Sequence, residues 1–163
     1  MAWYRKSQSI DAKYFDALRE NDIDSAKRMV DEAANSAGFT QRAWHQTGGD
    51  SFTAFDPDVS YDGGFWFTTD QGTIERGETG AGQSGRVMEC WLNTGNEAGW
   101  DEYDKSSPIE LARDGFDSAR LDGDIVVFSP ARIKSANIIT YDNEGKAIPL
   151  SERFNVSNSD VRW

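Results

Sequence analysis

The sequence predicts an α+β fold in which a pair of helices precedes a core of mostly antiparallel strands. Up to Gly38, apolar residues recur at helical spacing, whereas after Gly38 short aromatic and β-branched runs alternate with glycine-containing turns. No apolar strand leads into the glycine fingerprint and crossover helix of a parallel dinucleotide-binding sheet. A helical lead followed by strands, without repeated βαβ units, indicates the α+β class.

Composition is typical of one soluble domain whose core contains many large rings. Aromatic residues make up 12% of the 163 residues, and each buried ring supplies a large apolar area. The net charge of -11 repels polyanions and favours a protein or small molecule over nucleic acid as the partner. With one cysteine and one histidine, neither an intrachain disulfide nor a dedicated metal site is expected. No apolar run approaches a membrane span and no signal peptide is seen, so we expect a cytoplasmic protein.

Residues 1–38 are predicted to contain a helical hairpin that serves as a packing element. Apolar residues in two stretches share a face at helical spacing, and Asn21-Asp22 interrupts the pattern between them. Asp24 or Ser25 can cap the second helix.

The remaining chain divides into a core, residues 39–150, and a polar tail, residues 151–163, that we expect to be poorly ordered. Patterns typical of strands cover residues 43–47, 65–69, 86–92, 124–128 and 133–141. The glycine-rich stretch 70–85 is interpreted as a loop able to cover a site, residues 93–107 as a polar loop, and residues 108–114 as a helix. Alternation places Phe65 and Phe67 on one strand face and Trp66 on the other.

Five short motifs follow one another in a particular order. They are Val30-Asp31-Glu32-Ala33-Ala34, Trp44-His45-Gln46-Thr47, Phe65-Trp66-Phe67-Thr68, Gly115-Phe116-Asp117-Ser118, and Phe128-Ser129-Pro130-Ala131-Arg132-Ile133-Lys134-Ser135-Ala136. In this order and spacing, they make the chain from about Asp11 to Ala136 resemble the ADP-ribosyltransferase domains of phage and mobile-element polyvalent proteins. The resemblance implies split antiparallel β-sheets with a cleft for NAD between them, and a phage or mobile-element protein acting in the cytoplasm of a bacterial host.

The resemblance also implies roles for the second motif. His45 would hydrogen-bond a ribose hydroxyl of NAD and take part in catalysis. The backbone of Gln46 would hold the nicotinamide amide, assisted by the hydroxyl of Thr47. A peptide group can do this with any side chain that points away, although glycine is usual where Gln46 stands.

Further roles fall on the aromatic strand and on the strand that begins with an acid. Trp66 would line the nicotinamide pocket, with Phe67 and Thr68 as further candidate cofactor-binding residues. Asp124 would be the catalytic acid, in a position where glutamate is usual, and would stabilise the positive charge that develops on the ribose. Asp122, two residues earlier, would bind the acceptor.

The function implied is mono-ADP-ribosyl transfer from NAD, as a substrate, to a macromolecular acceptor, with protein favoured over nucleic acid and no metal required. Two alternatives remain: a catalytically degenerate module that keeps the fold for binding, and an NAD glycohydrolase that uses water as acceptor. Purely structural interpretations also remain for single residues. Asp122-Gly123-Asp124 has the composition of a hairpin turn, and Arg132 and Lys134 either attract the NAD pyrophosphate or are simply solvated at a sheet edge.

Overall fold

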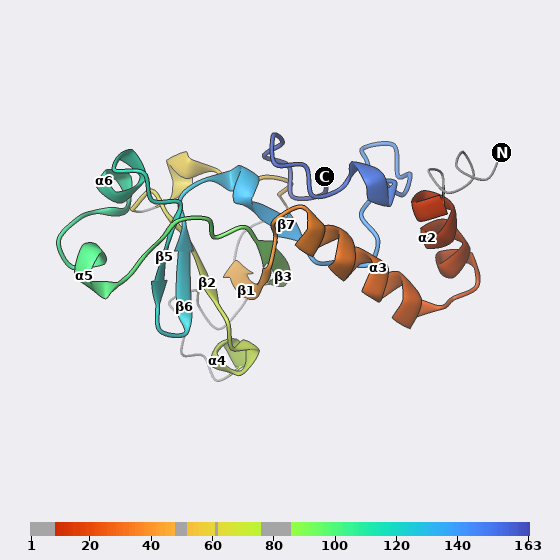
Figure 1. The fold of residues 1–163 in the computed structure, drawn as a ribbon, viewed down its shortest axis with the longest axis horizontal. Helices are drawn as coiled ribbons and strands as arrows, with labels where there is room; N and C mark the ends of the chain where they lie inside the picture. Colours follow the sequence, from red (N-terminus) through yellow and green to blue (C-terminus); the bar gives the residue numbers. More distant parts are fainter. Residues whose placement is uncertain (1–8, 48–51, 61, 76–85) are drawn as a thin grey trace.

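The computed structural model describes residues 9–47, 52–60, 62–75 and 86–163. It confirms the α+β class: a pair of helices leads into a seven-stranded, mixed and mostly antiparallel sheet. The helix pair lies at one end of the molecule, and the short helices α5 and α6 lie at the other (Figure 1). Within the described ranges, no helix has the length and apolar character needed to cross a membrane.

The two N-terminal helices form the predicted hairpin and pack onto the rest of the protein. Helix α2 spans Ser9–Arg19 and helix α3 spans Ile23–Ser36. The cap of α3 differs from the prediction, because the Asp22 side chain, rather than that of Asp24 or Ser25, accepts from the Ser25 backbone N–H at 3.2 Å. Buried residues of the hairpin join others from the far end of the chain in one apolar cluster, Tyr14, Val30, Ala34, Phe39, Trp91, Leu150 and Phe154.

Seven strands make up the sheet, in the order β4-β5-β6-β2-β1-β3-β7. Their bounds are β1 Gln41–Thr47, β2 Phe65–Thr68, β3 Arg86–Leu92, β4 Glu97–Ala98, β5 Ser118–Leu121, β6 Asp124–Val127 and β7 Ile133–Ser135. All neighbours are antiparallel except β4 and β5. Strand β5 was not expected, and it forms a hairpin with β6 whose turn is Asp122-Gly123, as the turn interpretation of that segment predicts.

Short helices occupy segments between the strands. They are α4 Gln71–Glu75, α5 Trp100–Tyr103 and α6 Pro108–Arg113, with 3₁₀ turns η1 Pro57–Val59, η2 Pro130–Arg132 and η3 Leu150–Glu152. The α6 prediction is confirmed, whereas the loop expected over 93–107 contains β4 and α5. Helix α5 forms because the Glu102 carboxylate accepts from the Gly99 backbone N–H at 3.0 Å. Most of the glycine-rich stretch, residues 76–85, lies outside the described residues.

The aromatic strand β2 separates two environments. Phe65 and Phe67 are buried with Phe55, Ile125 and other residues in the main core, whereas Trp66 remains 36% exposed. This alternation agrees with the predicted faces.

The sheet has a narrow junction between β1 and β2. Strand β1 pairs with β3 along its whole length and β2 pairs with β6 along its whole length. Between β1 and β2, however, the only register pair in the described part of the chain is Trp44 with Thr68. The junction therefore joins two parts of the sheet, β4-β5-β6-β2 and β1-β3-β7.

Residues 151–163 are packed into the fold, so the expectation of a poorly ordered tail is wrong. The Val161 backbone N–H donates to the Thr53 carbonyl at 2.7 Å, and its carbonyl accepts from the Ser135 N–H at 2.8 Å. The Val161 side chain is buried in the main core. The segment therefore connects the edge of β7 to residues 53–55, and β7 ends at Ser135 instead of continuing to residue 141.

Two basic residues of the β7 region have structural partners. Lys134 is buried, and its ammonium donates to the carbonyls of Asn158 at 2.6 Å and Asp160 at 3.1 Å. Arg132 forms an ion pair with Asp117 at 3.2 Å. Lys134 therefore anchors the C-terminal segment, and neither interpretation drawn from the sequence describes its contacts.

Candidate functional site

His45 lies at the junction of the two parts of the sheet. Its Nδ1 is 2.7 Å from the main-chain carbonyl oxygen of Trp66, and its ring contacts Phe55 and Phe67 with centroids 5.1 and 5.4 Å away. Because a carbonyl oxygen only accepts, Nδ1 must carry the proton. In the neutral ring, Nε2 is then a hydrogen-bond acceptor with a fixed orientation.

Burial keeps this imidazole neutral. Removal from water lowers the pKa of His45, and the hydrogen bond to the Trp66 carbonyl opposes that effect only in part. The residue is therefore uncharged at neutral pH, and its Nε2 is suited to accept a hydrogen bond from a hydroxyl group of a ligand.

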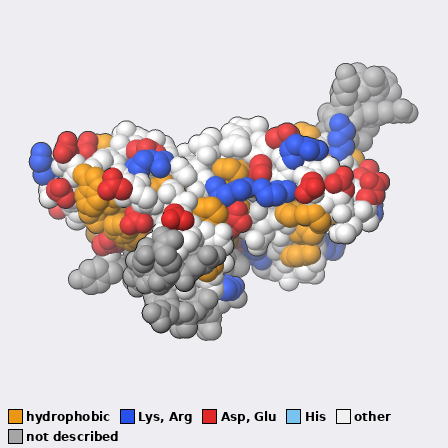
Figure 2. Space-filling model, turned by 90° about the horizontal axis from the view of Figure 1, so that it is seen from below, with side chains coloured by type: hydrophobic (Ala, Val, Ile, Leu, Met, Phe, Trp, Pro, Cys, Tyr) orange, Lys and Arg blue, Asp and Glu red, His pale blue; other side chains and the backbone are white. Residues whose placement is uncertain are grey.

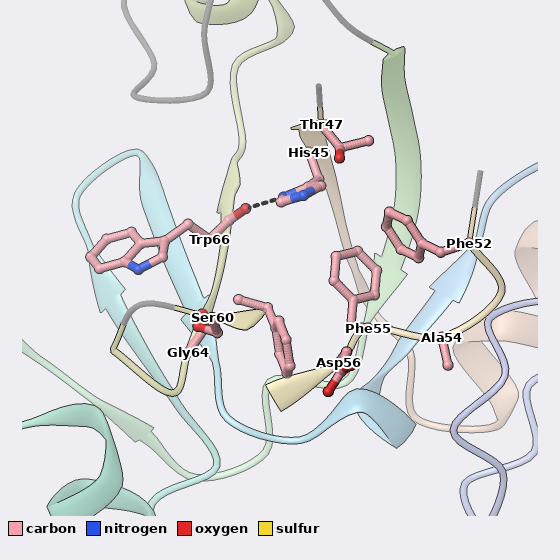
Figure 3. Close-up of a pocket in the computed structure, with 10 residues that line it drawn as sticks. His45, Thr47, Phe52, Ala54, Phe55, Asp56, Ser60, Gly64 and Trp66 are labelled. Carbon is pink, nitrogen blue, oxygen red and sulfur yellow. Dashed lines mark hydrogen bonds between the residues drawn. The ribbon is translucent and has the colours of Figure 1, made fainter. Parts of the chain in front are cut away.

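A pocket of about 360 Å³ opens beside His45. Its wall is formed by the ends of β1 and β2 and by the segment between them: His45, Thr47, Phe52, Ala54, Phe55, Asp56, Ser60, Gly64, Phe65 and Trp66 (Figure 3). The volume lies in the lower part of the range for small-molecule sites, and a mainly apolar wall with few polar groups is typical of them. The pocket can therefore hold a flat ring and an attached polar group.

The wall contributed by the segment before β2 is held in place by local hydrogen bonds. The Ser60 hydroxyl donates to the Gly64 carbonyl at 2.5 Å, and the Asp62 carboxylate accepts from the Gly64 N–H at 3.1 Å. Gly64 also lies close under β6, because a Cβ atom added there would be 2.3 Å from a methyl carbon of Val126. Only glycine fits this approach of the loop to the sheet.

Asp124 is exposed at the first position of β6, next to Thr68 on β2. Partial burial, and then the negative charge of Asp122, raise the pKa of its carboxyl group. The register places Asp124 on the sheet face of Trp66 and Thr68, whereas the His45 ring contacts Phe67, which belongs to the other face. Asp124 is not among the residues that line the pocket, but Trp66, which shares its face, does line it.

The other candidates from the sequence divide into two groups. Thr47 and Trp66 line the pocket with His45. Gln46, Phe67 and Thr68 are buried and do not line it. The Thr68 hydroxyl is used within the chain, since it donates to the Asp70 carbonyl and accepts from the Asp70 N–H, both at 3.2 Å.

Asp122 occupies the β5–β6 turn with a φ of 58°. Its carboxylate accepts a hydrogen bond from the indole N–H of Trp100 at 3.2 Å. The turn therefore brings two acids and an exposed tryptophan together on one face.

Sequence reasoning missed the six pocket residues in the segment between β1 and β2: Phe52, Ala54, Phe55, Asp56, Ser60 and Gly64. They have no strand or helix periodicity, and the presence of two phenylalanines in a polar loop is the one signal that could have identified them. Phe55 is buried against His45, Phe65 and Phe67, so this segment belongs to the core as well as to the pocket.

Comparison of the chain with protein-family models, with curated proteins and with solved structures finds no match. Within the described ranges, no three metal-ligating side chains come together as a potential ion site.

Proposed function

We propose that the protein binds NAD at the β1–β2 junction and transfers its ADP-ribose group to a macromolecular acceptor in a bacterial host. The observation that carries the proposal is the neutral His45 imidazole, fixed by the Trp66 carbonyl at the edge of a mainly apolar pocket. In the part of the chain that the structure describes, one register pair joins β1 to β2, which is consistent with the split sheets that the resemblance implies.

Each part of the pocket suits one part of the nicotinamide end of NAD. Nε2 of His45 can accept from a ribose hydroxyl, because Nδ1 holds the proton. The rings of Trp66 and Phe55 offer apolar surface to the nicotinamide. The pocket volume suits the nicotinamide with its ribose, and the adenosine half would then extend along the surface.

Asp124 would act on the reacting ribose from the side of Trp66. In the reaction, the bond between ribose C1′ and the nicotinamide nitrogen breaks, and its electron pair leaves with nicotinamide. The ribose becomes oxocarbenium-like, and a nearby carboxylate stabilises that positive charge. The acceptor nucleophile then bonds to C1′ and loses its proton. Asp124 lies one strand away from Trp66 on the same sheet face, although it is not part of the pocket wall, and this shared face is what supports the role.

The test measures NAD binding by titration calorimetry and nicotinamide release by chromatography. We expect Asp124→Asn to abolish release while NAD affinity is kept, and His45→Ala to weaken NAD binding by roughly 10-fold, the size of one buried hydrogen bond. Asp24→Asn, the same change on exposed helix α3, is the matched control and should leave both measurements unchanged. Asp124→Glu should raise the rate, because the longer side chain reaches further toward the ribose. A protein that shows no binding of NAD would refute the proposal.

A second candidate is a binding module that holds NAD without turnover. It is favoured by one observation, the position of Asp124 outside the pocket wall. Calorimetric binding without nicotinamide release would select this candidate. Release without labelled protein, after incubation of a host lysate with labelled NAD, would select NAD hydrolysis instead.

A further inference from the structure

Two exposed tryptophans and the half-buried tyrosine between them form a continuous aromatic surface on the face that carries Asp124. We name Trp66, Trp100 and Tyr103 the aromatic ledge. The rings of Trp66 and Tyr103 meet edge to face at 5.9 Å, and those of Trp100 and Tyr103 at 6.0 Å. Trp66 is 36% exposed and Trp100 is 47% exposed. The ledge is built from β2 and α5, which are more than 30 residues apart in the chain.

Carboxylates fix both indole rings of the ledge. Asp62 accepts from Trp66 Nε1 at 3.1 Å, and Asp122 accepts from Trp100 Nε1 at 3.2 Å. Each indole N–H is therefore satisfied by the protein itself, while ring area remains exposed to solvent. Figure 2 shows hydrophobic side chains bordered by acidic ones on the end of the molecule that carries α5.

The charge around the ledge is negative. Helix α5 contains Asp101 and Glu102, and Asp104 follows it. Asp124 lies on the neighbouring strand β6, on the same sheet face as Trp66. The pKa of Tyr103 is raised by burial and then by the charges of Asp62 and Asp104, which is consistent with a negative potential at the ring. Exposed aromatic area of this kind marks interaction sites, and a cation over a tryptophan face is attracted by the ring.

We infer that the aromatic ledge docks an arginine-bearing segment of a partner protein. A guanidinium can stack on an indole ring and at the same time donate two hydrogen bonds to a carboxylate. In the ledge, each exposed indole ring lies next to a carboxylate, Asp62 for Trp66 and Asp122 for Trp100. A lysine ammonium offers a point charge without the flat face. Docking of a peptide on the ledge needs no bound NAD, although Trp66 also lines the pocket. That the docked segment is also the acceptor rests on the proposed function.

The experiment measures peptide binding to the full chain by fluorescence anisotropy, without NAD. The probe is a short labelled peptide of alternating arginine and glycine, and the comparison peptides carry lysine or neutral citrulline in place of arginine. We expect the arginine peptide to bind best, the citrulline peptide to lose nearly all binding, and added salt to weaken binding. Trp100→Ala should weaken arginine-peptide binding by roughly 2- to 30-fold, the range expected for loss of a cation–aromatic contact.

Two controls keep the result decisive. Tyr141→Ala removes a similarly exposed aromatic residue, 51% exposed, outside the ledge and should bind like the wild type. Asp122→Asn keeps the size of the side chain but removes its charge, and should also weaken binding. Equal binding of the three peptides, equal binding of the lysine and arginine peptides, or wild-type affinity in Trp100→Ala would each overturn the inference. Self-association that disappears in Trp100→Ala would also overturn it, because the occupant would then be a second copy of the chain. Failure to release nicotinamide from NAD, in contrast, would contradict only the proposed function and not the docking of the peptide.

Discussion

Burial of the Lys134 ammonium predicts an unusual dependence of the free energy of unfolding on pH. Its ammonium is almost completely buried against two main-chain carbonyls, and burial lowers its pKa from 10.5 to about 8. Between these two values the unfolded chain binds more protons than the folded one, so the free energy of unfolding rises as the pH rises. The difference in pKa corresponds to roughly 3 kcal/mol when the whole window is crossed. A neutral amine still has two N–H groups, so after deprotonation Lys134 can still donate to the carbonyls of Asn158 and Asp160.

The assay is urea unfolding, followed by tryptophan fluorescence, of wild type and Lys134→Met at several pH values from 7.5 to 10.5. Subtracting the two free energies removes the titration of all other groups. We expect the wild type to gain stability over the variant from about pH 8 upward, by up to roughly 3 kcal/mol. A difference that stays constant across this range, or that falls, would show that the ammonium is solvated and the reasoning wrong.

Three more predictions concern the junction and the core. Burial lowers the pKa of His45, so as the pH falls below about 6.5 the unfolded chain takes up a proton that the folded chain does not. Wild type should therefore lose stability relative to His45→Gln between pH 7.5 and pH 5. A gain in stability of wild type over this range, measured by urea unfolding, would contradict the prediction. Gly64→Ala should destabilise the fold by roughly 1–3 kcal/mol, since the added methyl meets Val126, and an unchanged melting temperature would contradict the close approach. Val161→Ala should cost roughly 1.5–3 kcal/mol through lost burial and a residual cavity, measured by urea unfolding, and a cost near zero would mean that the C-terminal segment is detached.

The elements that the sequence predicted well are those with a local signal. Helix α3 has an apolar stripe and ends at Ser36, two residues before Gly38, whose φ of 94° is one that glycine adopts readily. Strand β3 matches its predicted bounds, and five of its seven residues are apolar. Strand β5, Ser-Ala-Arg-Leu, was missed because it has no β-branched or aromatic residue, unlike the equally short β2 and β6. Helix α5 was missed because four residues are too few for a helical pattern.

The site was predictable only in part, because it depends on register. Of the residues named from the sequence, His45, Thr47 and Trp66 line the pocket. The positions of Thr68 and Asp124 relative to it are decided by which residues of β2 face β1 and β6, and nothing local encodes that pairing. The C-terminal segment was misjudged for the same reason, since its many polar residues gave no sign that it would be tied to residues 53–55 and to Ser135.

The insertion of Val161 between Ser135 and Thr53 has a consequence for how the chain reaches this state during translation. A nascent chain that ends before Val161 leaves the ring of Phe55 and the edge of β7 without their final cover. Burial of this part of the core is completed only after Val161 has left the ribosome, and until then apolar surface beside Thr53 and Ser135 is open to chaperones. The interval between synthesis of residue 53 and of residue 161 is therefore a period in which the domain is incompletely closed.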